Sequence, residues 1–179
     1  MELRPWKTLT SRPVYANKWI RVREDVAALP NGQTTLYGVV TMGHAAGVLP
    51  FVDDDHVILV RQYRYVFGEA HRWEIPTGGL LAGEAAEAGA LRELQEEIGY
   101  TAGTLEWVST FYSSKSICEE TCHLFIGRDL QAAPLPPDAT EELEVATFAF
   151  ADVVDMVRKS EIRDAMSVIA ILHAAQLRA

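Results

Sequence analysis

Three glutamates that could bind a metal ion, Glu93, Glu96 and Glu97, lie three and four residues apart near the middle of the chain. On an α-helix these spacings place the three carboxylates on one face, where they repel one another. A hard cation such as Mg²⁺ or Mn²⁺ would cancel this repulsion, because both ions prefer oxygen ligands. The alternative is a solvated acidic helix face, which is the commoner meaning of a run of acidic residues. Spacing alone leaves both interpretations open.

A helix that follows a glycine-bearing loop must position these carboxylates. Leu91, Leu94 and Ile98 share the face opposite the glutamates, so one side of the helix is predicted to be buried. Gly99 is suited to the left-handed conformation that ends a helix. Glu84 is expected in the first helical turn, where a negative charge interacts favourably with the helix dipole.

Residues 78–100 resemble the signature of the Nudix hydrolases, G-x5-E-x7-R-E-U-x-E-E-x-G-U, in which U is an apolar residue. The matching positions are Gly78, Glu84, Arg92, Glu93, Leu94, Glu96, Glu97, Gly99 and, at the last apolar position, Tyr100. The resemblance implies Mg²⁺- or Mn²⁺-dependent hydrolysis of a nucleoside diphosphate linked to another group. It implies metal ligands at Glu93 and Glu97, with help from Glu96 and the main-chain carbonyl of Thr77. It also implies an ion pair between Glu84 and Arg92 that locks the loop against the helix.

Arg61 and Arg64 interrupt the Val- and Ile-rich end of a predicted strand. Two arginines there form either a solvated strand end or a phosphate-binding pair, for which the guanidinium fork is well shaped. This strand precedes the signature of residues 78–100, which we call the Nudix box. Together with the box, it is similar to a strand in the ADP-ribose and nucleoside-diphosphate-sugar pyrophosphatase branch of the family. That similarity implies that Arg64 reaches the substrate's phosphates. Glu74 and Glu120 are assigned to substrate binding on the same basis, together with Arg61.

Two substrate loops depart from the pattern of this branch. Lys115 and Ser116 stand where ADP-ribose hydrolases commonly carry proline and glycine, which favours a nucleoside diphosphate sugar as an alternative substrate. After the proline-rich stretch 131–138, the branch carries a glutamate that activates the attacking water. Glu141 is the first candidate for this catalytic role and Glu142 the second. Arg92 of the signature is also assigned to the catalytic residues. An acidic surface loop is the alternative interpretation.

The resemblance implies an α/β fold, a Nudix α/β/α sandwich with a mixed sheet and an N-terminal antiparallel β-hairpin sheet. Residues 1–42 are predicted to form the hairpin region, with a turn at Asn31-Gly32, and residues 43–179 the hydrolase domain. The hairpin region is expected to form a homodimer and to place Trp19 near the partner's base pocket. A packed hairpin aromatic is the alternative for Trp19.

The remaining elements follow from hydrophobic patterning. Residues 1–14 are predicted to be irregular, and residues 131–138 to be a surface loop. The Asp53-Asp54-Asp55 triplet is interpreted as a turn. Predicted strands cover 46–52, 56–65, 105–112, 121–126 and 145–150, and predicted helices cover 152–159 and 163–177.

Composition limits the classes of function. A chain of 179 residues is long enough for one domain with its own core, and its net charge of −9 argues against nucleic acid as a partner. No apolar run approaches membrane-spanning length, and residues 1–6 lack a signal-peptide core, so we expect a cytoplasmic enzyme with no membrane partner. Cys118 and Cys122, followed by His123, are expected to be reduced thiols, with zinc binding or a disulfide as alternatives.

Two functional alternatives remain at this stage. The substrate could be FAD, NADH or a nucleoside triphosphate. The domain could also be a sensor that binds nucleotide sugars without cleaving them, although such a module would be expected to have lost box carboxylates.

Overall fold

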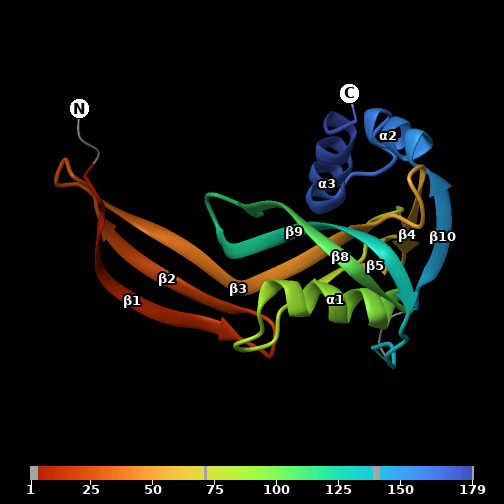
Figure 1. The fold of residues 1–179 in the computed structure, drawn as a ribbon. Helices are drawn as coiled ribbons and strands as arrows, with labels where there is room; N and C mark the ends of the chain where they lie inside the picture. The colour runs from red at the N-terminus through yellow and green to blue at the C-terminus, as the bar shows by residue number, and fades with distance from the viewer. Residues whose placement is uncertain (1–3, 71, 139–141, 179) are drawn as a thin grey trace. The chain divides into compact units, whose positions relative to one another are not determined.

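The computed structural model describes residues 4–70, 72–138 and 142–178 (Figure 1). The chain divides into two compact units, Met1–Gly43 with Tyr112–Thr121 and His44–Phe111 with Cys122–Ala179. Strands β3 (Thr34–Pro50) and β9 (Cys118–Ala132) each run through both units. No helix in the described part of the chain is long and apolar enough to cross a membrane.

The first unit contains β1 (Lys7–Ala16), β2 (Arg21–Ala28) and the first part of β3 (Thr34–Pro50). The three strands pair antiparallel in the order β1-β2-β3. The hairpin predicted around Asn31-Gly32 is confirmed. Gly32 has a φ of 85° there, and the Asn31 side chain accepts a hydrogen bond from the main-chain nitrogen of Gln33 at 3.0 Å.

The prediction that residues 1–14 are irregular is wrong, because most of them belong to β1. Every residue of β1 is exposed, so the strand lacks the apolar alternation that identifies a half-buried strand. It is an edge strand held mainly by main-chain pairing, and the edge position also accommodates Pro13.

The second unit contains the rest of β3 and β9, most of β8, the short strand β7, two two-stranded sheets and, among the described residues, three α-helices. Two-residue strands β5 and β6 flank a single 3-10 turn, and β4 pairs antiparallel with β10. The main sheet has the order β1-β2-β3-β9-β8, and β7 pairs antiparallel with β3. The bounds are β4 His56–Arg61, β5 Tyr63–Arg64, η1 Tyr65–Phe67, β6 Glu69–Ala70, β7 Thr77–Gly79, α1 Ala86–Glu97, β8 Tyr100–Tyr112, β9 Cys118–Ala132, β10 Glu144–Ala149, α2 Phe150–Arg158 and α3 Ala165–Gln176.

Two buried clusters cover opposite faces of the main sheet in this unit. Leu49 and Leu124 belong to a cluster whose helical members come from α2 and α3. Their chain neighbours Val48 and Phe125 belong to the other cluster, to which α1 contributes Ala90 and Leu94. Because successive strand residues point to opposite faces, α1 covers one face and α2 with α3 the other (Figure 1). The predicted α/β/α fold is confirmed.

Element boundaries differ from prediction mainly in the strands. The predicted strand 46–52 is the end of the longer β3, which continues through Gly43 at a φ of 92°. β8 and β9 are also longer than predicted, and β9 includes residues 131 and 132 of the expected loop. The aspartate triplet is a turn, since Asp53 Oδ1 accepts hydrogen bonds from the main-chain nitrogens of Asp55 and His56. Cys118 and Cys122, both among the described residues, form no disulfide.

Candidate active site

The loop before α1 is fixed by Glu84 rather than by a helix cap. α1 begins at Ala86 after the N-cap residue Ala85, so Glu84 precedes the helix, and Glu87 is the acidic residue of its first turn. The placement of Glu84 in the first turn is therefore wrong. Its Oε2 instead accepts a hydrogen bond from the main-chain nitrogen of Leu81 at 2.8 Å. At the other end, Gly99 has the predicted left-handed conformation, with a φ of 76°.

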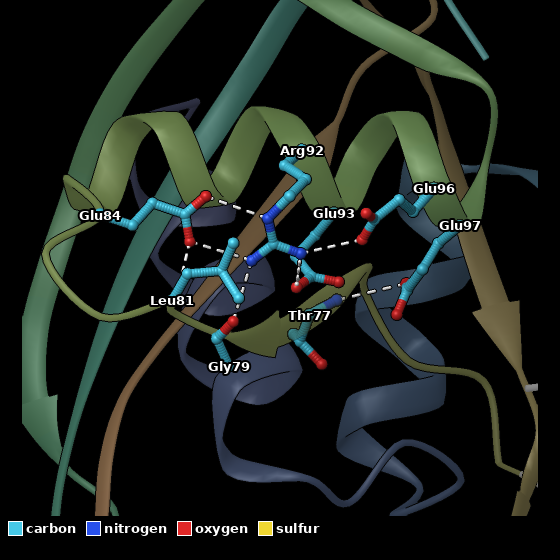
Figure 2. A network of polar contacts seen from close by, with 8 residues as sticks. All are labelled: Thr77, Gly79, Leu81, Glu84, Arg92, Glu93, Glu96 and Glu97. Carbon is cyan, nitrogen blue, oxygen red and sulfur yellow. Dashed lines mark hydrogen bonds and ion pairs between the residues drawn. The ribbon is translucent and has the colours of Figure 1, made fainter. Parts of the chain in front are cut away.

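Arg92 is the centre of a network that ties this loop to the carboxylates of α1 (Figure 2). Its Nε and Nη2 each donate to Glu84 at 3.0 Å, and Nη2 also donates to the carbonyl oxygen of Gly79 at 2.9 Å. Its Nη1 contacts Oε1 of Glu93 at 2.7 Å and Oε2 of Glu96 at 2.8 Å. The predicted Glu84–Arg92 pair is thus present, and the same guanidinium also reaches two of the predicted metal ligands.

The charges of this network stabilise one another in a partly shielded setting. The Arg92 side chain is 20% exposed and that of Glu84 13%. Hydrogen bonds from Arg92 lower the pKa of Glu84, although burial opposes the shift. The pKa of Arg92 is raised, first by Glu84 and then, against burial, by Glu93 and Glu96. The loop and helix are therefore held together by groups that stay charged at neutral pH.

Glu93 and Glu97 are buried, which contradicts a solvated acidic helix face for these two residues. The carboxylate of Glu93 lies directly over Gly78, so closely that a Cβ atom at position 78 would overlap it. Oε2 of Glu97 accepts a hydrogen bond from the main-chain nitrogen of Thr77 at 3.3 Å (Figure 2). The two carboxylates therefore lie beside the backbone of β7, next to the carbonyl that the sequence assigns to metal binding.

Arg64 and Glu74, both assigned to substrate binding, form an ion pair. Nη2 of Arg64 lies 2.5 Å from Oε1 of Glu74, and Nε donates to Oε2 at 3.3 Å. Glu74 is buried and Arg64 is partly exposed. Glu74 is placed there by a bridge to Val60 of β4, with main-chain hydrogen bonds in both directions. Because two nitrogens of Arg64 contact the two oxygens of Glu74, the ion pair fixes the orientation of the guanidinium.

Arg61 lies in a cavity of about 360 Å³ in the second unit, lined by Arg61, Gln62, Tyr63, Glu142, Leu143 and Glu144. Its guanidinium pairs with Glu144 at 2.6 Å and lies 4.7 Å from the ring centre of Trp73. The cavity thus brings Glu142, the second candidate for the catalytic base, to the predicted phosphate-binding strand. Glu141, the first candidate, lies outside the described residues.

Comparison with known proteins identifies the family. The model of the NUDIX domain matches residues 42–167, well over half of the chain and all of the box. The chain belongs to the Nudix family. A second model, the nucleoside diphosphate sugar hydrolase N-terminal domain, matches residues 6–40.

Three relatives of this Nudix protein carry different names. An ADP-ribose pyrophosphatase of Bacillus subtilis (strain 168) is 33% identical over 169 residues, 93% of this chain and 91% of the relative. A methanol dehydrogenase activator of Bacillus methanolicus is 30% identical over 171 residues, with the same coverage of 93% and 91%. A GDP-mannose pyrophosphatase of Cronobacter sakazakii (strain ATCC BAA-894) is 33% identical over 144 residues, 76% and 75% of the two chains. The domain match and these relatives support the prediction of a Nudix hydrolase.

A solved structure shows the same fold. The crystal structure of an ADP compounds hydrolase superposes with a TM-score of 0.88 and 24% sequence identity, covering 99% of this chain and 96% of that one. The likeness therefore extends over the N-terminal strands as well as the Nudix domain.

The residues of the Nudix box fit the divalent ion that such enzymes generally use. Among the described residues, no three acidic, histidine or cysteine side chains form a ready-made cage for a metal ion. Mg²⁺ does not require one, because it typically takes one or two carboxylates and completes its shell with water and phosphate oxygens. Gly78 provides the space for the Glu93 carboxylate, and Glu97 is held at Thr77. The donor set is the oxygen-rich type that Mg²⁺ and Mn²⁺ prefer.

The remaining predicted residues lie in the first unit. Trp19 is 69% exposed, and Nζ of Lys18 lies 4.0 Å from its ring centre. Glu120 is half-buried at the start of β9. Its neighbour Glu119 has the more extensive contacts, since it accepts a hydrogen bond from Thr41 at 2.8 Å and pairs with Arg23 at 3.2 Å. These bonds, that of Thr41 first, lower the pKa of Glu119.

The second unit contains a histidine pair, His44 and His123, that was not predicted from the sequence. Nδ1 of His44 lies 3.1 Å from Nε2 of His123, and the two rings are stacked 9° from parallel. Burial, and then the proximity of His44, lowers the pKa of His123. No local sequence pattern indicates this pair, because its members are 79 positions apart and meet only across the paired strands β3 and β9.

Proposed function

We propose that this Nudix enzyme hydrolyses the diphosphate bond of ADP-ribose or of a nucleoside diphosphate sugar. The products would be a nucleoside monophosphate and a ribose or sugar phosphate. The observation that carries the proposal is the buried pair of carboxylates, Glu93 and Glu97, at the backbone of Thr77 and within the Arg92 network. The names of the relatives, an ADP-ribose pyrophosphatase and a GDP-mannose pyrophosphatase, support the two substrate classes.

The box residues would hold the metal ion and keep its ligands in place. Glu93, Glu97, Glu96 and the carbonyl of Thr77 are the proposed ligands for Mg²⁺ or Mn²⁺. Such an ion, when bound, neutralises charge on the diphosphate and lowers the pKa of a coordinated water. Arg92 holds Glu93 and Glu96 in position and, through Glu84 and Gly79, fixes the loop against α1.

The strand residues would orient the diphosphate. The ion pair with Glu74 uses Nε and Nη2 of Arg64, and we assign Nη1 to a phosphate oxygen. Arg61, which lines a cavity together with Glu142, would also interact with the negative charge of the diphosphate. A glutamate of the loop before β10 would accept the proton of the attacking water, with Glu141 as the first candidate and Glu142 as the second. Positioned charges of this kind supply most of the rate enhancement in phosphoryl chemistry.

The assembly is proposed to be a homodimer in which the N-terminal strands take part. The model of the nucleoside diphosphate sugar hydrolase N-terminal domain, which matches residues 6–40, supports a role for this region in substrate handling. The high exposure of Trp19 leaves its ring available to stack on a base, and Glu120 would contact the substrate from the same region. The cytoplasmic location, and the lack of a nucleic-acid partner, remain predictions from the sequence.

The experiment that tests the proposal is a comparison of substrates. Phosphate release, coupled to a phosphatase, would be measured for ADP-ribose, UDP-glucose, GDP-mannose, FAD, NADH and a nucleoside triphosphate, each with Mg²⁺. We expect ADP-ribose or a nucleotide sugar to have the highest kcat/KM. A lead for a nucleotide sugar would assign the change of specificity to Lys115 and Ser116. Highest turnover of FAD, NADH or a triphosphate would refute the substrate class, and absence of turnover would favour a sensor.

The homodimer has its own test. Sedimentation velocity at micromolar concentration should give the mass of two chains. A single-chain mass would remove both the dimer and the proposed role of Trp19 in a shared pocket.

A further inference from the structure

The first unit contains a cavity of about 330 Å³ whose residues belong neither to the Nudix box nor to the phosphate-binding strand. Its lining residues are Trp6, Thr8, Asp25, Ala27 and Tyr37. Thr8 is paired with Ala27 across β1 and β2, and Asp25 with Tyr37 across β2 and β3. Paired residues, and residues two apart on one strand, point to the same face of a sheet. The cavity is therefore built on one face of the three N-terminal strands.

One carboxylate oxygen in this cavity lacks a partner. Asp25 is only 8% exposed, and its Oδ1 is buried with no hydrogen bond to any of the described residues. Oδ2 accepts a bond from Nε of Arg23 at 3.2 Å. A buried ionised oxygen without a partner is unfavourable, so such an atom indicates a donor that is supplied from elsewhere.

The charge around Asp25 remains negative in spite of Arg23. The guanidinium of Arg23 is shared with a second carboxylate, because its Nη1 lies 3.2 Å from Glu119. Arg23, Asp25 and Glu119 together therefore carry one net negative charge. The pKa of Asp25 is lowered, first by a hydrogen bond from the Ser11 hydroxyl and then, against burial, by Arg23. Asp25 is consequently ionised at neutral pH.

The aromatic lining of the cavity favours a cation. The rings of Trp6 and Tyr37 lie 6.2 Å apart at an angle of 87°. Aromatic ring faces attract ammonium and guanidinium groups, because the face is the negative side of the ring quadrupole. Trp6 is 51% exposed, so a ligand can reach the cavity from solvent.

The dimensions and ligands of the cavity distinguish an organic cation from a metal ion or a single water. The lining side chains supply one carboxylate, from Asp25, and two hydroxyls, from Thr8 and Tyr37, too few oxygens for a hard metal ion that takes six or more ligands. The volume of about 330 Å³ is many times the roughly 30 Å³ that a water occupies. We propose that this cavity binds a small aliphatic amine, whose ammonium N–H donates to Oδ1 of Asp25 and whose charge lies beside Trp6 and Tyr37.

The test is an NMR titration of the ¹⁵N-labelled full chain with n-butylammonium chloride. The indole N–H resonance of Trp6, assigned from the spectrum of Trp6→Phe, should shift and saturate with a dissociation constant on the order of 1 mM. Tetramethylammonium, which has the charge but no N–H, should bind about tenfold more weakly. Butanol, which has a donor but no charge, should give no saturable shift.

Matched variants separate the site from a general effect of charge. Asp25→Asn should weaken n-butylammonium binding about tenfold or more, observed through the backbone amides of β2 and β3. Glu24→Gln makes the same change of charge on the opposite face of β2, where Glu24 pairs with Arg12, and should keep the wild-type affinity within about twofold. Trp6→Leu, at a half-exposed position outside the core, should weaken binding about threefold without lowering the melting temperature.

Three results would overturn the proposal. One is a linear drift of the resonances without saturation, and another is equal affinity of Asp25→Asn and wild type. The third is an affinity that disappears as the protein concentration rises, because a second copy of the chain would then cover the cavity. None of these readouts depends on turnover, so a failure here is distinct from a failure of the proposed hydrolase function.

Discussion

Replacement of Arg92 by methionine is the perturbation that best tests the physical account of the box. Methionine keeps much of the aliphatic side chain and removes the guanidinium. The substitution eliminates two hydrogen bonds to Glu84, one to the Gly79 carbonyl, and contacts with Glu93 and Glu96. It leaves the Glu84 carboxylate, 13% exposed, without its charged partner.

The expected loss lies between those of an exposed and a buried ion pair. Exposed pairs contribute about 0–1 kcal/mol, and removal of one partner from a buried pair costs about 3–5 kcal/mol. Since Arg92 is 20% and Glu84 13% exposed, we expect Arg92→Met to lower the free energy of unfolding by about 3 kcal/mol. For a chain of this size, that corresponds to a fall of roughly 6–12 °C in Tm.

The same prediction has a dependence on pH. The pKa of Glu84 in the folded protein is lowered below its ordinary value of 4.5, mainly by Arg92. A depressed carboxylate pKa contributes stability that is present above the unfolded pKa and is lost as pH falls through the folded value. The difference between wild type and Arg92→Met should therefore be full at neutral pH and should shrink below about pH 4.5.

Urea denaturation followed by circular dichroism would measure the effect, in EDTA and again with saturating Mg²⁺. Arg158→Met is the matched control, because Arg158 and Asp155 are 71% and 54% exposed and their pair should contribute little. Mg²⁺ should restore more stability to Arg92→Met than to wild type, since it replaces the missing positive charge beside the box glutamates. A loss within about 0.5 kcal/mol of that of Arg158→Met would refute the shielded network. If Mg²⁺ raises the free energy of unfolding of Arg92→Met and of wild type by the same amount, the Arg92 network does not influence metal binding.

Two further predictions concern the geometry of the site. Gly78→Ala should lower both kcat and Tm, because the added Cβ overlaps the Glu93 carboxylate, whereas Gly79→Ala has open space and should keep wild-type stability; equal melting temperatures would contradict the placement of Glu93. Glu141→Gln should lower kcat more than Glu142→Gln, by about 10²–10⁴-fold for the true base, and the reverse order in steady-state assays would reassign the catalytic base.

Local spacing explains which parts of the site were predictable. Glu93, Glu96 and Glu97 lie on one helix, so their proximity follows from the helical repeat alone. The reach of Arg92 to Gly79 depends on how the loop folds back along α1, which spacing does not encode. Glu84 was predicted in the first helical turn, but the helix begins only at Ala86; the predicted pairing of Glu84 with Arg92 is present.

Contacts between distant segments were the least predictable. Arg64 and Glu74 were assigned separately to the substrate, and their ion pair arises only because Glu74 bridges to Val60 of β4. β1 was missed because an exposed edge strand has no alternation of apolar residues. The lack of a hydrogen bond to Oδ1 of Asp25 could not be predicted either. It depends on the register of β1, β2 and β3, which determines the neighbours of Asp25 on β1 and β3.

Metal-dependent hydrolysis at the glutamates of α1 is tested by the Mg²⁺ dependence of ADP-ribose cleavage by wild type and Glu97→Gln, with products identified by ³¹P NMR. We predict AMP and ribose 5-phosphate from wild type only when Mg²⁺ is present. Glu97→Gln should lower kcat by about 10²–10⁴-fold, because charge stabilisation by the metal ion is worth several kcal/mol, while Tm should be largely retained. Near-normal kcat for Glu97→Gln, or wild-type turnover that persists in EDTA, would contradict a metal site built on the glutamates of α1.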